Sequence, residues 1–340
     1  MNMDLEKIKT RSVIVKLIRR WFDERGFLEM HTPRLVGLPG QEPHLDPFWT
    51  EVFTPSLTAH RSSFPAALIT SPEYMMKRLL AEGLDKIYDL GPCFRNNEPW
   101  DGTHDPEFLM LEWYRCEAGL EDLMCDTEEM IRFVFHELRA TGYTLRTEPF
   151  RRLTVEEAWR EYSRIELAPL LENREAMAKV VKEHNQTVLP GDSWDDLFFK
   201  IFLSEIEPCL GKKVPTFLYC YPANMAALAR KSVDDPRWAE RVELYIGDFE
   251  LANGFAELSD SIEQRARFEE ERILRHKLGK KIWNFDERFL SSLSKMGNAA
   301  GMAFGVDRLV MLLTGAKSIN EILPESARER FEEQLLDGRL

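Results

Sequence analysis

The stretch that decides the fold is CFRNNEPWDGTHDPEFLMLEWYR, residues 93–115. A short apolar run ends at Arg95, a polar loop with Pro99, Asp101 and Gly102 follows, and a second apolar run closes the stretch. Turn-forming residues between two such runs predict two strands joined by a loop. An arginine, a histidine and acidic residues gather on this hairpin, so we expect it to carry chemistry as well as structure.

The segments on either side of the hairpin read as a mixture of helices and strands. Apolar residues at helical spacing predict a helix over residues 8–25, which Gly26 ends. Ser71, Pro72 and Glu73 have the order of a helix start, with Ser71 as the cap. Further along, helical patterns fill residues 120–205 and strand patterns return over 216–258.

The order of these elements predicts an α+β fold. Strands grouped on both sides of a helical segment favour a mainly antiparallel sheet flanked by helices. The chain has 340 residues, without an internal repeat or low-complexity linker. We therefore expect a single catalytic domain over residues 1–340, with a helical insertion at about 120–205.

Composition limits the classes of partner. The net charge of -13 argues against nonspecific nucleic-acid binding, because phosphate neutralisation needs a lysine and arginine surplus. A basic run over residues 265–281 is interpreted as a solvated helix face. Five cysteines without a CxxC pair argue against a disulfide framework or zinc site. No apolar run approaches the length of a membrane span, so we expect a cytoplasmic protein.

Three segments together resemble one enzyme family. RGFLEMHTP (25–33), the hairpin and GMAFGVDRL (301–309) are similar to motifs 1, 2 and 3 of the class II aminoacyl-tRNA synthetases. Four further matches resemble the lysine branch of that family: TSPEYMMKRLL, THDPEFLMLEWY, FELANGFAELSD and GVDRLVMLLTG. The resemblance covers roughly residues 8–325 and implies a seven-stranded sheet flanked by helices.

The resemblance implies adenylate formation, in which a substrate carboxylate attacks the α-phosphate of ATP and pyrophosphate leaves. Such a reaction needs positive charge already in place around the phosphates. Arg95 resembles the motif 2 arginine on the α-phosphate, and Arg308 the motif 3 arginine on the γ-phosphate. The guanidinium fork suits phosphate geometry better than a lysine does. We expect these two arginines to be the catalytic residues.

The nucleotide site that the resemblance implies involves both strands of the hairpin. Phe108 would stack under adenine, His104 would close over the triphosphate, and Gly305 would leave room for ATP. Glu243 and Glu250 would bind Mg²⁺ through hard oxygen ligands. The expected ATP-binding residues are Arg95, Asn96, Asn97, Glu98, His104, Asp105, Phe108, Glu250, Leu251, Gly305 and Arg308.

Selection of a diamine such as lysine needs buried negative charge. Glu73 resembles the residue that meets the backbone-side amino group. Glu257 resembles the one that meets the ε-amino group, with Tyr114 as a hydroxyl partner, and Asn253 would position the carboxylate. The expected substrate-binding residues are Ser71, Pro72, Glu73, Tyr114, Asn253, Glu257 and Ala303.

The chain departs from the lysine branch at three positions. Ala303 replaces the middle glycine of motif 3, which changes the pocket floor and could favour a β-amino substrate. Motif 2 contains one inserted residue, so either Glu98 keeps the adenine contact after a shift or Asn97 replaces it. Asp105 stands where the family often has asparagine, and its charge suits the triphosphate only if it faces away or meets Mg²⁺.

The short architecture leaves three hypotheses. Because motif 1 lies near the start, we expect no N-terminal OB-fold for anticodon reading. This short architecture resembles the synthetase paralogues that attach (R)-β-lysine to a lysine side chain of elongation factor P, and a ligase of that kind is the first hypothesis. The alternatives are a truncated lysyl-tRNA synthetase that charges tRNA and a catalytically silent binding paralogue. The missing anticodon domain and the acidic charge argue against stable tRNA binding. Motif 1 is a dimer element in this class, so we expect a homodimer.

Overall fold

The computed structural model describes residues 4–54, 62–138, 145 and 147–332. The chain divides into two compact units. Unit one consists of residues 1–117, 129–145 and 259–340, and unit two of residues 118–128 and 146–258. The units interleave along the chain, and the expectation of a single catalytic domain stays a prediction.

Unit one is built on the predicted hairpin. Strands β5 (Lys86–Phe94) and β6 (Glu107–Cys116) pair antiparallel, as the pattern predicts. On the far side of β6 lies antiparallel β11 (Ala299–Gly305), and on the far side of β5 lies parallel β1 (Leu28–Met30). The order β1-β5-β6-β11 therefore places motif 3 directly beside the second strand of motif 2.

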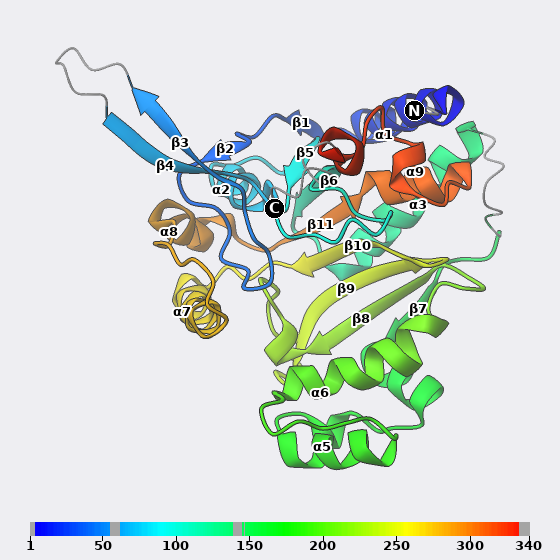
Figure 1. The fold of residues 1–340 in the computed structure, drawn as a ribbon, viewed down its shortest axis with the longest axis vertical. Helices are drawn as coiled ribbons and strands as arrows, with labels where there is room; N and C mark the ends of the chain where they lie inside the picture. Colours follow the sequence, from blue (N-terminus) through cyan, green and yellow to red (C-terminus); the bar gives the residue numbers. More distant parts are fainter. Residues whose placement is uncertain (1–3, 55–61, 139–144, 146, 333–340) are drawn as a thin grey trace. The chain divides into compact units, whose positions relative to one another are not determined.

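A second, smaller sheet belongs to the same unit. It has the order β2-β4-β3, with β2 at Leu35–Val36, β3 at Trp49–Thr54 and β4 at Ser62–Leu68, and its pairs are antiparallel. Figure 1 shows β3 and β4 extending together away from β2. The segment between β2 and β3 returns to the motif 2 loop, where Asp46 bridges Asn96.

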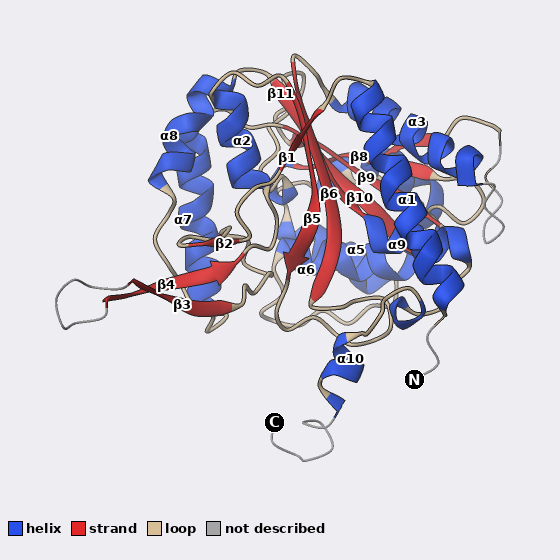
Figure 2. Ribbon diagram, turned by 90° about the horizontal axis from the view of Figure 1, so that it is seen from above, coloured by secondary structure: helices blue, strands red, loops and turns tan. Residues whose placement is uncertain are grey.

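The helices of unit one follow the predicted starts closely. Helix α1 spans Leu5–Glu24, and Gly26 follows with φ of 76°. Helix α2 spans Glu73–Ala81. It packs on α8 (Glu287–Met296), which packs in turn on α7 (Ser261–Lys277), as Figure 2 shows. Unit one also contains α9 (Val306–Thr314), the 3-10 turn Ile319–Glu321 and α10 (Ala327–Arg330).

Unit two also carries four strands of the main sheet. They are β7 (Arg151–Thr154), β8 (Thr216–Pro222), β9 (Trp238–Ile246) and β10 (Phe249–Ala256). The pairs β10–β9 and β9–β8 are antiparallel, and β8–β7 is parallel. Among the described residues, the main sheet has eight strands, one more than the seven that the resemblance implies. Most strand pairs within each unit are antiparallel, as predicted.

The region predicted as a helical insertion is helical with one strand, β7, among the helices. Helix α3 (Leu120–Leu138) comes first and belongs partly to each unit. Helices α4 (Val155–Ala158), α5 (Arg174–Glu183) and α6 (Trp194–Ile201) follow in unit two. Figure 1 shows α6 and α5 on the same side of β8 and β9. The helices bury Trp159, Met177 and Phe198 against β8 and β9 in one apolar core.

Candidate active site

The motif 2 hairpin brings the predicted arginine and phenylalanine together. Cys93 lies opposite Phe108 in the strand register, and the Arg95 amide donates to the Pro106 carbonyl at 3.0 Å. The Arg95 guanidinium lies over the Phe108 ring, 5.0 Å from its centroid. The buried Nε of Arg95 has no hydrogen-bond partner in the described part of the chain. A donor left open in this way is suited to an anionic ligand.

The motif 3 arginine reaches the motif 2 loop through His104. Arg308 Nη2 lies 3.0 Å from His104 Nε2, while His104 Nδ1 lies 3.1 Å from the Asp101 carboxylate. Because guanidinium only donates, Nε2 must accept and Nδ1 carries the proton toward Asp101. Burial raises the pKa of Asp101, but hydrogen bonds from Thr103 and His104 outweigh it and lower that pKa to about 2. The loop is therefore connected to Arg308 by a defined chain of polar contacts.

Asp307, next to this arginine, fixes the start of α9. Its carboxylate accepts from the Leu109 amide at 2.7 Å and from Arg11 Nε at 2.8 Å. Gly305 lies opposite Met110 in the pairing of β11 with β6. These contacts hold the first turn of α9 against the second hairpin strand, so Arg308 projects from a rigid base.

A buried carboxylate lies at the amino acid end of the hairpin. Glu112, 1% exposed, accepts from the Ser71 hydroxyl at 2.6 Å and from the Tyr114 hydroxyl at 2.9 Å. Burial, reinforced by the charge of Glu73, raises the pKa of Glu112 to about 8. Glu112 lies within the predicted hairpin, but the sequence pattern assigns it no role. Its position two residues before Tyr114, on the same face of one strand, was the signal that could have found it.

Glu73 is held at the start of α2. The helix begins at Glu73 with Pro72 at its cap position, one residue later than predicted. The Ser71 hydroxyl still accepts from the Glu73 amide at 3.0 Å. The Glu73 carboxylate forms an ion pair with buried Lys77, one helical turn later. An incoming ammonium would share this carboxylate with Lys77.

A cavity of about 890 Å³ in unit one reaches the start of α2. The segment Ser71–Glu73 lines it, together with Glu42 and residues of α7 and α8. Ala303 lies opposite Glu112 in the strand register, so its methyl group lies beside the carboxylate cluster, on the same face of the sheet. A substitution of the family glycine at this position therefore changes the immediate surroundings of Glu112.

In unit two, a β-bulge gathers the other predicted residues on one face. Glu250 pairs with Tyr245 and Asn253 with Glu243, and the register shifts between Glu250 and Ala252. An unbroken strand would place residues 250 and 253 on opposite faces, because side chains alternate. The extra residue restores them to the same face. Buried Leu251, predicted as an ATP contact, is that extra residue.

Glu243 is already surrounded by donors. Arg241 Nη2 and the Tyr221 hydroxyl donate to its carboxylate, and the Tyr245 hydroxyl donates at 2.6 Å. Burial and the charge of Glu243 raise the pKa of both tyrosines well above the usual range, so they remain donors. A cation at Glu243 would have to compete with these three donors.

Two further predicted residues are half-buried Asn253 on β10 and Glu257, which directly follows that strand. Glu257 is buried, and its backbone bridges Ala229. Asn253 Oδ1 is buried without a hydrogen-bond partner among the described residues. Among those residues, no group of three or more His, Cys, Asp or Glu side chains could hold a metal ion. A magnesium ion would therefore depend on oxygens supplied by its ligand as well as on Glu250.

Asp105, predicted as an ATP contact, has its carboxylate directed at α10 in this structure. Its carboxylate is buried and accepts from the Ala327 amide at 2.6 Å, from Arg330 Nη2 at 2.9 Å and from the Glu107 amide at 3.1 Å. The side chain therefore faces α10 and anchors it to the hairpin. This explains why a negative charge is acceptable here in place of the family asparagine.

The motif 2 loop is tied to the C-terminal segment at two further points. The Ile319 amide donates to the Gly102 carbonyl at 2.7 Å, and the rings of Trp100 and Phe331 stack with centroids 6.0 Å apart. Asn96 and Asn97, by contrast, contact the segment that precedes β3. Glu98 is half-buried between these two sets of contacts.

Comparison with known proteins defines the class. The family described as tRNA synthetases class II (D, K and N) matches residues 2–325. The chain belongs to the class II aminoacyl-tRNA synthetase family. No helix among the described residues has the length and apolar character needed to cross a membrane.

The curated relatives narrow the likeness within that class. Proteins named elongation factor P–(R)-β-lysine ligase from Avibacterium paragallinarum and Proteus mirabilis are each 37% identical to the chain, over 94% and 95% of both sequences. The protein of that name from Pasteurella multocida is 38% identical over 95% of both sequences. The chain is thus similar to these ligases along nearly its whole length.

Proposed function

We propose that this chain is an ATP-dependent ligase that activates (R)-β-lysine or lysine as an aminoacyl-adenylate and transfers it to a lysine side chain of elongation factor P. Full-length similarity to ligases of that name supports the acceptor and the substrate. The observation that carries the chemistry is the buried Glu112 carboxylate with its Ser71 and Tyr114 donors, in the same unit as Arg95 and Arg308.

The first step joins the substrate carboxylate to the α-phosphorus of ATP and breaks the bond to the pyrophosphate oxygen. Arg95, with an open buried donor, is proposed to stabilise charge at the α-phosphate. Arg308 is proposed to hold the γ-phosphate with His104 beside it. Phe108 would receive the adenine ring, and Glu98 its amino edge.

The second step transfers the acyl group to protein. The acceptor lysine amine attacks the acyl carbon, loses a proton and displaces AMP, so that an amide forms. No protein nucleophile is needed, because the adenylate is already activated. Mg²⁺ would supply phosphate charge neutralisation, and Glu250 is proposed as its protein ligand on the family resemblance.

Substrate selection is assigned to carboxylates. Glu73 and Glu112 are the proposed partners of the substrate ammonium groups in unit one. The roles of Glu257 and Asn253 stay predictions from the family resemblance. Ala303 beside Glu112 is proposed to favour a β-amino over an α-amino group.

The decisive experiment is transfer of labelled (R)-β-lysine or lysine in the presence of ATP and Mg²⁺, with elongation factor P and tRNA offered separately. We expect label on elongation factor P. Label on tRNA alone would establish the synthetase alternative, and no ATP–pyrophosphate exchange with any amino acid would favour a silent paralogue.

The two arginines provide the matched test of the chemistry. Arg95→Ala and Arg308→Ala are each expected to lower exchange by roughly 100-fold or more, because each removes charge stabilisation in the transition state. Arg237→Ala, which removes an exposed arginine from a turn, is the control and should exchange normally.

The oligomeric state, the absence of stable tRNA binding and the cellular location are also proposals. We propose a homodimer formed through motif 1, without stable tRNA binding, in the cytoplasm. The net charge of -13 supports the proposal that tRNA is not bound stably. The odd number of cysteines without a CxxC pair supports the cytoplasmic location.

A further inference from the structure

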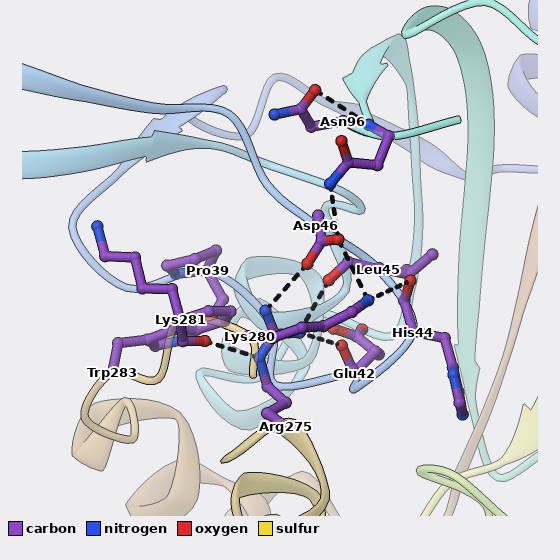
Figure 3. Close-up of polar contacts among 11 residues, drawn as sticks. Pro39, Glu42, His44, Leu45, Asp46, Asn96, Arg275, Lys280, Lys281 and Trp283 are labelled. Carbon is purple, nitrogen blue, oxygen red and sulfur yellow. Dashed lines mark hydrogen bonds and ion pairs between the residues drawn. The ribbon is translucent and has the colours of Figure 1, made fainter. Parts of the chain in front are cut away.

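The segment before β3 is anchored to α7 by a buried arginine (Figure 3). Arg275, only 1% exposed, donates to the carbonyls of Glu42 at 2.7 Å and Leu45 at 2.9 Å. Its guanidinium also lies over the Trp283 ring, 4.3 Å from the centroid, and its Nε donates to the Lys281 carbonyl at 3.0 Å. The expectation of a solvated face is therefore wrong for Arg275, which fixes the path of residues 42–46.

Asp46 is the point at which this anchored segment meets motif 2. Its carbonyl accepts from the Asn96 amide at 2.7 Å, and its carboxylate accepts from Asn97 Nδ2 at 3.0 Å. The same carboxylate lies 3.2 Å from Arg275 Nη2 and 3.2 Å from Lys280 Nζ. Figure 3 shows Asp46 between these cations and Asn96. One residue therefore contacts both the backbone and a side chain at the start of the ATP loop.

The backbone conformation of Asn97 can accommodate the residue inserted in motif 2. Its φ is 60°, in the left-handed region that non-glycine residues seldom adopt and that asparagine tolerates better than most. Its amide N–H donates to the Asn96 side-chain oxygen at 3.0 Å. A single left-handed residue redirects the chain, which is how a loop can take up one more residue than the family pattern has.

The Asp46–Asn97 contact uses the side chain that would otherwise compete for the nucleotide. With its Nδ2 on Asp46, Asn97 is directed toward the anchored segment. Glu98, the next residue, is then left for the adenine edge. This contact favours Glu98 over Asn97 for the adenine contact, a choice that the sequence leaves open.

We propose that Asp46 is a positioning residue for nucleotide binding: it holds the inserted Asn97 in its left-handed turn, so that Arg95 and Glu98 keep the register needed for ATP. This inference rests on the proposed function for its kinetic consequence. Its structural part, that Asp46 orders residues 96–98, stands separately and can be measured without turnover.

The test compares Asp46→Ala, Asn97→Gly and the double variant in steady-state exchange assays. Both single variants should raise KM for ATP roughly 5- to 10-fold, with kcat and the KM for the amino acid changed less than twofold. The double variant should be no worse than the poorer single one, because both remove the same contact. Asp46→Asn keeps an acceptor oxygen for Asn97 and should restore near-normal KM, whereas Lys280→Gln should have no effect.

Amide hydrogen exchange of residues 96–98 gives the readout without activity. Exchange there should be faster in Asp46→Ala and close to wild type in Asp46→Asn. Unchanged exchange and unchanged KM in Asp46→Ala would overturn the inference, as would additive effects in the double variant. If Asp46→Asn behaves like Asp46→Ala, the charge on Arg275 and Lys280 matters instead of the Asn97 contact. If wild type forms no adenylate, the proposed function fails while the exchange comparison still decides the inference.

Discussion

At the scale of single residues, Glu112 shows how a binding group can weaken the fold that contains it. A carboxyl group with a pKa of about 8 prefers its neutral form inside the protein, whereas the unfolded chain ionises it near pH 4.5. Between these values the folded protein binds more protons than the unfolded chain. The free energy of unfolding therefore falls as the pH rises through this window.

We predict that Glu112→Gln stabilises the free protein at pH 8. The amide keeps hydrogen-bonding capacity toward Ser71 and Tyr114 and removes the buried ionisation, so the gain should be roughly 1–3 kcal/mol. At pH 5, where the wild-type group is neutral, the two proteins should be nearly equal. Urea unfolding at both pH values measures this, and a gain independent of pH would contradict it.

The same substitution should damage function. ATP–pyrophosphate exchange by Glu112→Gln should fall by at least about tenfold, because the variant cannot neutralise a substrate ammonium. Glu107→Gln, on the same strand but exposed, is the control and should change neither property.

The sequence predicted which residues belong to the site better than it predicted what each side chain contacts. Arg95 contacts Phe108, and Arg308 contacts His104, so the motif order predicted two local pairs. Asp105 was assigned to ATP and instead holds α10, since its partner Arg330 lies 225 residues away in the chain. Local pattern carries no information about a contact of that range.

At the scale of elements, periodicity predicts strands and helices but not irregularities within them. The runs that form β5, β6, β9 and β10 were all recognisable, yet the bulge at Leu251 was not. Bulges depend on the neighbouring strand as much as on the bulged residue, so a single sequence does not specify them. Glu250 and Asn253 lie on the same face of the sheet only because of that bulge.

Helix α10 offers a prediction at this scale. Arg330→Met should leave the buried Asp105 carboxylate with two backbone donors in place of three partners, and lower the free energy of unfolding by roughly 2 kcal/mol. Arg328→Met, an exposed neighbour on the same helix, is the matched control. Equal stability of the two variants would show that the ion pair contributes nothing.

At the scale of the whole molecule, the family could be predicted because three motifs occur in order. The division into two interleaved units could not, since it depends on contact density across the chain and not on a linker. The α+β class with mostly antiparallel pairs was predictable from the grouping of strands alone.

The proposed homodimer provides the prediction for the whole molecule. Val13 on α1 and Leu28 on β1 are 44% and 53% exposed within motif 1 and its preceding helix. Val13→Glu combined with Leu28→Glu should give a sedimenting mass near one chain, 39.7 kDa, where wild type gives twice that. Ile262→Glu, on exposed α7 surface, should remain dimeric. A wild type that sediments as one chain would refute the proposal.

The protonated state of Glu112 has a calorimetric consequence. At neutral pH an arriving diammonium compound would convert the neutral carboxyl group into its anion, and the displaced hydrogen ion would pass to the buffer. Heats of titration collected in phosphate and in Tris should then differ in proportion to the ionisation enthalpies of those buffers. The slope of that comparison would count the hydrogen ions released per ligand bound.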